Sequence, residues 1–392
     1  MRSVELFAGA GGLGIGISRA GFNPEAVIEW DTYCCDTIRE NQAQKLKPVV
    51  DWPLIETDVR DFDFSSVFGD IDLVSGGPPC QPFSLGGKHR GYLDERDMFP
   101  QAIRAVRELK PKAFIFENVK GLTRTSFASY LEYIRLCLTY PEIVERYGED
   151  WTKHLTRLER YHTRGKCDGL RYRIIMRLLN AANYGIPQRR ERVFLIGFRH
   201  DLGIEWSFPD ETHNQDALLW SQWRTSNYWD RHKIAKRLRP EGGKGKARAL
   251  MLREVPRLAP WRTVREAISD LPDPEKNPTA SAAYHNHRFQ SGARSYPGHT
   301  GSPLDEPAKT LKAGDHGVPG GENMLLRPDG SIRYFTVRES ARLQTFPDDF
   351  LFHGSWTESM RQLGNAVPVD LATIFASDVK AHLVSAINVG KG

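Results

Sequence analysis

The sequence is poor in cysteine and has no long apolar run. Its cysteines are odd in number and form no CxxC pair, which argues against a disulfide framework or a zinc ribbon and favours a reducing compartment; they are Cys34, Cys35, Cys80, Cys137 and Cys167. No stretch of about 18 consecutive apolar residues occurs, so we expect no membrane span and a cytoplasmic location. Residues 1–17 superficially resemble a signal peptide, but Glu5 and the spaced glycines fit a strand and a turn better.

Charge and composition exclude little by themselves. The net charge is only +5, which is a weak hint of a polyanionic partner, and 40% hydrophobic with 26% charged residues is ordinary for a globular protein. A chain of 392 residues is long enough for two domains.

Short apolar segments alternate with helical spacing through the first half of the chain. Strands are expected at residues 4–7, 26–29, 71–74, 113–116 and 193–198, and helices at 13–20, 99–109 and 371–387. This alternation predicts an α/β fold, Rossmann-like, with a mostly parallel sheet. After residue 200 the sequence becomes rich in Pro, Gly, Trp and basic residues. We therefore expect an α/β domain formed by residues 1–200 and 335–392, interrupted by a smaller irregular domain at 201–334, with an insertion near 140–170.

A glycine turn directly follows the first expected strand. Residues 9–14 match GxGxxG, and Glu29 ends the second strand, where its carboxylate can accept hydrogen bonds from ribose hydroxyls. The pattern predicts a nucleoside cofactor without separating NAD from S-adenosylmethionine. A glycine turn without a ligand is the alternative. Asp58 follows a third apolar segment and can bond an adenine amino group, although alone it reads as a surface aspartate.

Cys80 stands between prolines just past the strand at 71–74, at the edge where open α/β sheets bind ligands. Glu117 follows another strand at the same edge. Arg190 and Arg192 share one face of an extended segment, and Asn365 stands before the last helix. The alternatives are a buried structural thiol, a solvated charge run and a helix cap. The thiol of Cys80 and the acid Glu117 beside a nucleoside pocket suggest covalent chemistry on a ring that needs protonation.

In their order along the chain, these stretches resemble the motifs of the DNA cytosine-C5 methyltransferases. The motifs are FAGAGG at 7–12, PPCQ at 78–81, ENV at 117–119, QRRER at 188–192, RESARLQTFP at 338–347 and GN at 364–365. The resemblance is dense over residues 1–200 and 335–392. It is thin between them, where TVREAI at 263–268 and TL at 310–311 look familiar. It implies an S-adenosylmethionine-dependent methyltransferase domain interrupted by a target-recognition domain.

The resemblance assigns roles to four catalytic residues. Cys80 would attack carbon 6 of a cytosine flipped out of a duplex, so that carbon 5 takes the methyl group. Glu117 would contact the ring nitrogen N3 and the amino group, and Arg192 the carbonyl oxygen. Arg190 would be a partner of the loop after Cys80. The base that removes the carbon 5 proton is not identified, and water is one candidate.

The resemblance also implies S-adenosylmethionine as methyl donor, with no metal. The turn would line the cofactor, Glu29 hold its ribose, Trp30 pack on adenine and Asp58 bond its amino group. The full cofactor set is Phe7, Ala8, Gly9, Gly11, Gly12, Leu13, Glu29, Trp30, Asp58, Val59, Pro78 and Asn365. Four histidines, His285, His287, His299 and His316, show no ligand pattern and read as surface or DNA-contacting residues.

Two stretches are expected to contact DNA. Residues 84–91 resemble the family's mobile loop, with contacts from Ser84, Lys88 and Arg90. Residues 231–262 carry eleven Lys or Arg against two acids, which suits phosphate contacts and singles out Lys233, Lys236 and Arg237. A solvated face is the alternative. Three tryptophans in this part, Trp220, Trp223 and Trp229, are expected to form a small core.

Three other functions remain open. A tRNA cytosine-C5 methyltransferase is disfavoured by the size of the 201–334 region. A catalytically inactive DNA-binding or scaffold protein is disfavoured by the intact Cys80, Glu117, Arg190 and Arg192. An NAD dehydrogenase would not explain Cys80. We therefore expect a stand-alone, monomeric modification enzyme of bacterial or phage type, associated with the nucleoid through double-stranded DNA. A companion restriction endonuclease is compatible with this function, without a stable complex.

Overall fold

A computed structural model describes residues 1–79, 97–165, 169–297, 300–314 and 321–389. The chain forms two compact units. The first comprises Met1–Leu179, Glu191–Pro209 and Ala372–Gly392, and the second comprises Asn180–Arg190 and Asp210–Leu371. Residues 335–371, which the sequence pattern groups with the catalytic domain, belong to the second unit. The functional division at residues 200 and 334 stays a prediction.

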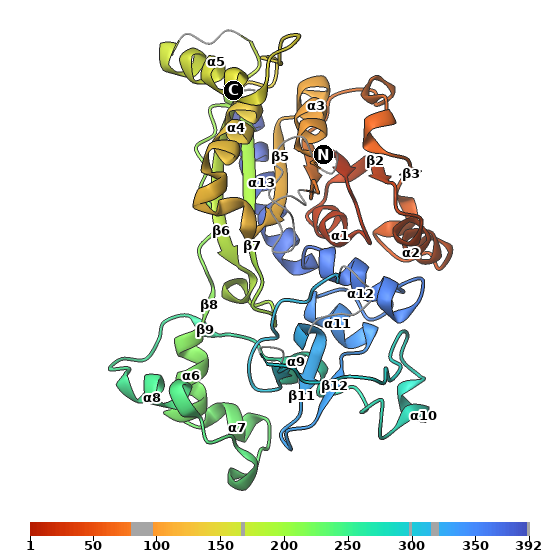
Figure 1. The fold of residues 1–392 in the computed structure, drawn as a ribbon, viewed down its shortest axis with the longest axis vertical. Coiled ribbons are helices and arrows are strands. Elements are labelled where there is room, and N and C mark those ends of the chain that lie inside the picture. The colour runs from red at the N-terminus through yellow and green to blue at the C-terminus, as the bar shows by residue number, and fades with distance from the viewer. Residues whose placement is uncertain (80–96, 166–168, 298–299, 315–320, 390–392) are drawn as a thin grey trace. The chain divides into compact units, whose positions relative to one another are not determined.

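A seven-stranded sheet in the order β3-β2-β1-β4-β5-β7-β6 forms the centre of the first unit (Figure 1). Its strands are β1 Arg2–Leu6, β2 Asn23–Glu29, β3 Leu54–Glu56, β4 Leu73–Gly76, β5 Ala113–Val119, β6 Tyr172–Asn180 and β7 Glu191–Arg199. The five strands β1 to β5 run parallel, and β7 runs antiparallel to β5. The predicted α/β fold with a mostly parallel sheet is therefore confirmed.

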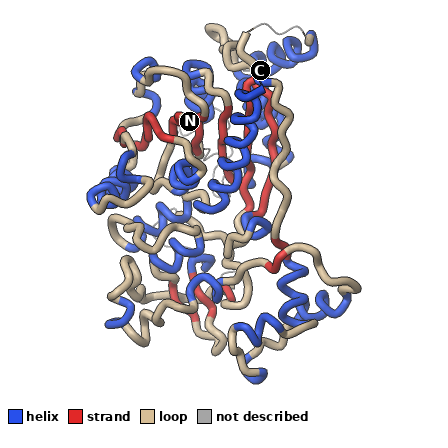
Figure 2. Tube along the Cα trace, turned by 180° about the vertical axis from the view of Figure 1, so that it is seen from behind, coloured by secondary structure: helices blue, strands red, loops and turns tan. Residues whose placement is uncertain are grey.

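Helices cover both faces of this sheet. The helices of the unit are α1 Gly12–Arg19, α2 Thr32–Ala43, α3 Phe99–Leu109, α4 Ala128–Thr139, α5 Trp151–Arg164 and α13 Val369–Val389. Strand residues such as Val4 and Leu6 pack against α3 and α4 in one core. On the other face, Phe194 of β7 meets Phe375 of α13 with ring centroids 4.9 Å apart, and Figure 2 shows α13 lying along the strands. The segment expected as an insertion contains α5.

The second unit is built from short elements. Its helices are α6 Gln215–Trp223, α7 Asn227–Arg231, α8 Gly243–Met251, α9 Val264–Ile268, α10 Pro278–Ser281, α11 Val337–Leu343 and α12 Trp356–Asn365. A three-stranded sheet contains β10 Ser302–Pro303, β11 Met324–Leu326 and β12 Ile332–Tyr334, and β8 His213–Asn214 pairs with β9 Ala259–Pro260. None of the described helices in either unit has the length and apolarity needed to cross a membrane.

A small aromatic core holds α6 and α7 together. Trp229 is buried with Tyr228 and Trp261, and Trp223 packs partly against them. The expected core role is therefore confirmed for Trp223 and Trp229. Trp220 lies outside this cluster and is instead covered by the guanidinium of Arg224, 5.0 Å from its ring centroid.

Candidate active site

The turn after β1 has a backbone that few side chains tolerate. Phe7, Gly9 and Gly11 all adopt left-handed conformations, with φ of 53°, 56° and 87°. Glycine adopts these angles without strain, whereas Phe7 does so at a cost of about 1–3 kcal/mol. Such strain in a non-glycine residue is typical of functional sites. The helix α1 begins at Gly12, directly after this turn.

The glycines of this turn have different reasons to be there. A Cβ atom on Gly11 or on Gly14 would lie 2.9 Å from the indole of Trp52, which packs over the turn. A Cβ on Gly9 would meet no atom within 4 Å. Gly11 and Gly14 thus make room for a side chain of the protein itself. Gly9 leaves open space beside the strand end, where a ligand can approach the backbone.

Glu29 at the end of β2 organises this turn. Its carboxylate accepts hydrogen bonds from the backbone N–H groups of Gly9 at 2.6 Å, Trp30 at 2.9 Å and Asp31 at 2.8 Å. Burial raises the pKa of this carboxyl group, while the three N–H donors oppose the shift. Since a carboxylate offers about four acceptor positions, one position remains for a ligand hydroxyl.

The other expected cofactor residues have different surroundings. Asp58 caps a short 3-10 helix, and its hydrogen bond from Arg60 lowers the pKa of its carboxyl group. The neighbouring Val59 is buried. Trp30 has 68% of its surface exposed, so its ring is available for stacking. Asn365 is the last residue of α12 and is exposed, and it belongs to the second compact unit.

Glu117 and Arg192, which are far apart in the sequence, meet at the carboxyl edge of the parallel strands. In the antiparallel pair β5–β7, Glu117 stands opposite Phe194 and Val119 opposite Arg192, so Glu117 and Arg192 are diagonal neighbours on one face. The Arg192 Nε atom lies 2.9 Å from Oε1 of Glu117, and both side chains are largely buried. Burial lowers the pKa of Arg192, and the carboxylate of Glu117 opposes this shift.

The loop after β4 is held beside this pair. Asn118 donates from Nδ2 to the carbonyl oxygen of Pro78 at 2.8 Å, and the amide of Met98 donates to the carbonyl oxygen of Pro79 at 3.0 Å. A Cβ on Gly77 would lie 3.5 Å from Oε2 of Glu117. The segment that leads into Cys80 therefore runs past the Glu117 carboxylate. The expected residues Cys80, Ser84, Lys88 and Arg90 lie outside the described residues.

Arg190 and Arg192, which were expected on one face of an extended segment, belong to different compact units. Arg190 is buried in the second compact unit, where its guanidinium donates to the carbonyl oxygens of Leu311 at 3.2 Å and Gly364 at 2.8 Å. Its expected contact with the loop after Cys80 lies outside the described residues. The expected DNA-contacting residues Lys233, Lys236 and Arg237 are exposed in the second unit.

The roles of two buried polar residues of the sheet were missed by sequence reasoning. Asn118 anchors Pro78, and the signal was its position next to Glu117 at a strand end. Glu5 of β1 is buried beside Ser75 of β4, whose hydroxyl donates to it, and burial raises the pKa of Glu5 to about 8. An acid in the middle of a short apolar strand was the signal for this pair. Among the described residues, no group of three potential metal ligands occurs.

One hollow of the described structure lies away from this edge. It has a volume of about 300 Å³ and is lined by residues at the opposite edge of the sheet, namely Gly69, Asp70, Ile71, Glu108, Leu109, Lys110, Lys112 and Arg199. Since ligands of open α/β sheets bind beyond the carboxyl ends of the strands, we take the edge with Glu117 as the site.

A parallel sheet with a glycine turn after β1 and an acid at the end of β2 defines the class of α/β enzymes that use a nucleoside cofactor. Comparison with known proteins narrows this class. The model of the family "C-5 cytosine-specific DNA methylase" matches residues 1–138 and 160–381. The chain belongs to this family and is a DNA (cytosine-5-)-methyltransferase.

Individual relatives resemble the chain over nearly all of its length. The type II methyltransferase M.Eco47II of Escherichia coli is 31% identical over 98% of this chain and 80% of its own length. The type II methyltransferase M.PspPI of Psychrobacter sp. is 33% identical over 94% of this chain and 76% of its own length. The solved structure of the Dnmt2 methyltransferase of S. pombe superposes with a TM-score of 0.56 at 18% identity, covering 98% of this chain and 99% of that one. This last likeness concerns the fold alone.

Proposed function

We propose that the protein transfers a methyl group from S-adenosylmethionine to carbon 5 of a flipped-out cytosine in a specific duplex DNA sequence, through a covalent Cys80 adduct at carbon 6. The observation that carries the proposal is the contact of 2.9 Å between Glu117 and Arg192, beside the segment that leads into Cys80. A carboxyl group and a guanidinium so placed complement one edge of a cytosine ring.

The pair suits the polar atoms of the base. Arg192 donates hydrogen bonds and fits the carbonyl oxygen, whereas the Glu117 carboxyl group accepts from the amino group and, when protonated, donates to N3. Addition of a thiolate at carbon 6 pushes negative charge toward N3 and the carbonyl oxygen. Donors fixed at those two atoms stabilise this charge at little reorganisation cost, because both side chains are already buried.

Cys80 carries the covalent step. Its thiolate forms the bond to carbon 6, and the ring electrons make carbon 5 nucleophilic toward the methyl group. Loss of the carbon 5 proton to a base then returns the electron pair that expels the thiolate. Two other cysteines are poor competitors, because burial raises the pKa of both Cys35 and Cys137 to about 12.

The cofactor would lie at the glycine turn. S-adenosylmethionine supplies an electrophilic methyl group when bound. The open space at Gly9 and the remaining acceptor position of Glu29 fit a nucleoside there, and the exposed ring of Trp30 offers a stacking surface. Asp58 would bond the adenine amino group after giving up part of its contact with Arg60. Pro78 and Asn365 complete the proposed set.

DNA would be held by exposed basic residues. Flipping a cytosine out of the stack costs a few kcal/mol, which protein–DNA contacts must offset. We assign phosphate contacts to Lys233, Lys236 and Arg237 and target recognition to residues 201–334. The curated relatives are type II methyltransferases, so a companion restriction endonuclease is proposed as the partner in function.

A fluorinated substrate tests the covalent mechanism. Bisulfite sequencing of DNA from cells that express the protein first gives the target sequence, and transfer to tRNA is measured in parallel. A duplex with 5-fluorocytosine at the target should then trap the enzyme, because elimination needs a proton at carbon 5. The adduct should survive denaturation, require S-adenosylmethionine and map to Cys80.

The control is Cys80→Ser, which should bind DNA but form no adduct, because an alcohol is a far weaker nucleophile than a thiolate. The covalent mechanism would be refuted by an adduct at any other cysteine, or by the absence of an adduct with an enzyme that does methylate DNA. Transfer to tRNA in place of duplex DNA would overturn the proposed substrate.

A further inference from the structure

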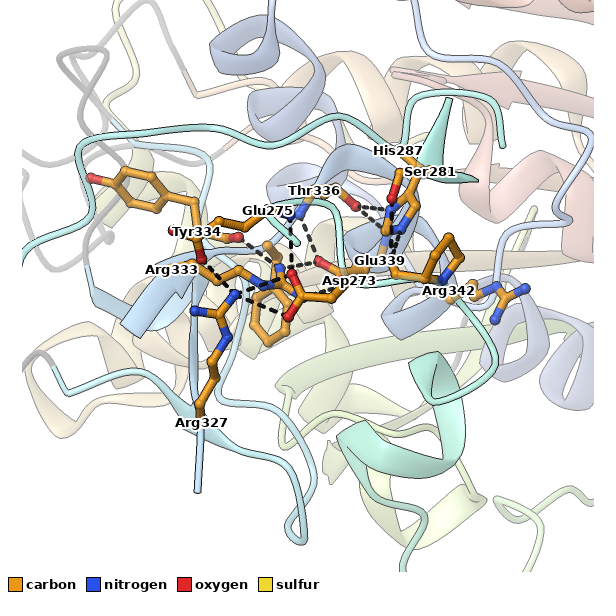
Figure 3. Close-up of polar contacts among 12 residues, drawn as sticks. Asp273, Glu275, Ser281, His287, Arg327, Arg333, Tyr334, Thr336, Glu339 and Arg342 are labelled. Carbon is orange, nitrogen blue, oxygen red and sulfur yellow. Dashed lines mark hydrogen bonds and ion pairs between the residues drawn. The ribbon is translucent and has the colours of Figure 1, made fainter. Parts of the chain in front are cut away.

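A buried polar network connects three segments of the second unit (Figure 3). Arg333 of β12 donates to Glu339 of α11 through two bonds of 2.7 and 2.6 Å, and 5% and 2% of these two side chains are exposed. Glu339 also accepts from the backbone N–H of Thr336 at 2.9 Å, and the Thr336 hydroxyl lies 2.8 Å from Nδ1 of His287. The start of α11 is thereby tied to the segment around His287.

His287 is fixed from both sides. Its side chain is fully buried, so the expected surface position of His287 is wrong. Its other ring nitrogen, Nε2, lies 2.8 Å from the carbonyl oxygen of Pro272. A buried ring with a partner at each nitrogen has a single orientation, because any rotation would leave a polar atom unpaired.

The two residues before His287 are fixed as well. Asn286 has a φ of 58°, and its side-chain amide makes two bonds with the backbone of Phe352, at 2.9 and 3.1 Å. Arg338 is completely buried, and its Nε atom donates to the carbonyl oxygen of His285 at 3.0 Å. The backbone N–H of Arg338 donates to the carbonyl oxygen of Asn286, also at 3.0 Å. Three consecutive residues are therefore held by hydrogen bonds to other segments of the chain.

The anchored segment presents cationic and aromatic groups to the solvent. His285 and Arg288 are exposed, and Tyr284 and Phe289 have 37% and 40% of their surfaces exposed. Within the described parts of the chain, Arg288 has no ion-pair partner. No Asp or Glu occurs from residue 276 to residue 304. The surface thus combines an unneutralised guanidinium with an adjacent ring on a rigid backbone.

We infer that Arg288, supported by Phe289, reads the target sequence in the DNA, an inference that rests on the proposed function. A guanidinium discriminates bases by bidentate hydrogen bonds in the major groove, which requires a fixed direction of approach. The anchors at residues 285–287 supply that direction. Lys233, Lys236 and Arg237 lack such anchors among the described residues and suit the sequence-independent phosphates instead.

Variants of the protein can separate recognition of the target DNA sequence from sequence-independent attraction to DNA. Affinity is measured for a duplex with the target sequence, as found by bisulfite sequencing with the wild-type protein, and for a duplex in which it is scrambled. Arg288→Ala should lower the affinity for the target about 10- to 100-fold and leave the scrambled duplex nearly unchanged. Arg294→Ala removes another exposed arginine, outside the anchored segment, and it should leave the ratio of the two affinities as in the wild type.

Asn286→Ala loosens the anchor without touching Arg288 and should lower the same ratio. The inference would be overturned if Arg288→Ala lowered the affinity for both duplexes equally or lowered neither. It would also be overturned if Arg294→Ala changed the ratio of the two affinities as Arg288→Ala does. If the wild-type protein methylates no duplex cytosine, it is the proposed function that fails. If it does and Arg288→Ala keeps full discrimination, only this inference fails.

Discussion

The Glu5→Gln substitution should change how the stability of the fold depends on pH. Glu5 lies in the centre of the sheet with 3% of its surface exposed, and Ser75 donates a hydrogen bond to one of its carboxyl oxygens. Its other oxygen has no hydrogen-bond partner among the described residues. Burial raises the pKa of this carboxyl group from 4.5 to about 8, because the charged form loses its hydration. Glu5 is therefore protonated in the folded protein at neutral pH.

The sign of the effect follows from the two pKa values. Between pH 4.5 and about 8 the unfolded chain has lost the Glu5 proton and the folded protein has kept it, so stability falls as pH rises. One pH unit corresponds to about 1.4 kcal/mol, so the loss amounts to about 4–5 kcal/mol across the interval. Glutamine does not titrate, and the Glu5→Gln variant should lack this component of the pH dependence.

Urea unfolding of both proteins from pH 5 to pH 8.5 measures the prediction. Any constant cost of burying the glutamine amide cancels, since only the change of the difference with pH matters. Relative to the wild type, the free energy of unfolding of the variant should increase steadily with pH up to about pH 8. A constant difference across this range would show that Glu5 titrates normally in the folded protein, and the argument from burial would be refuted.

Three further predictions concern other parts of the molecule. Glu29→Ala leaves three backbone N–H groups without their acceptor, so urea unfolding should show a loss on the order of 2–5 kcal/mol together with weaker S-adenosylmethionine binding in calorimetry; unchanged stability would show that the carboxylate serves only the ligand. Gly364→Ala places a Cβ 2.2 Å from a backbone nitrogen and should cost about 1–3 kcal/mol in the same assay. Charge reversal at Lys233, Lys236 and Arg237 should weaken binding to all DNA sequences alike and reduce the log–log salt slope by about 0.9 for each lost contact; an unchanged slope would make the patch a solvated face.

The fold was largely predictable because its strands are short apolar segments that end in polar residues. The expected strands at 4–7, 26–29, 71–74, 113–116 and 193–198 all occur with small shifts of their bounds. β6 was missed, because its exposed middle breaks the alternation of apolar and polar residues. A segment of this kind becomes a strand only through pairing with a neighbour, which sequence periodicity does not reveal.

The sequence patterns singled out candidate site residues, but not the contacts between them. Glu117 and Arg192 were each singled out, yet their contact depends on the register of β5 and β7, which no local pattern encodes. The partners of Arg190 were hidden for another reason. They are the backbone carbonyl groups of Leu311 and Gly364. Every residue type has such a carbonyl group, so the residue identities at these two positions do not reveal the contact.

The position of Trp52 over Gly11 and Gly14 has a consequence for reading glycine-rich turns in general. Two of the glycines in this motif are required by an indole ring that the chain supplies itself, just before β3. A smaller residue in place of Trp52 would free Gly14 for a larger side chain, whereas Gly11 would still favour glycine because its φ is 87°. A larger residue in place of Gly14 in a related sequence should therefore be compared with the residue at position 52 before it is taken as loss of cofactor binding.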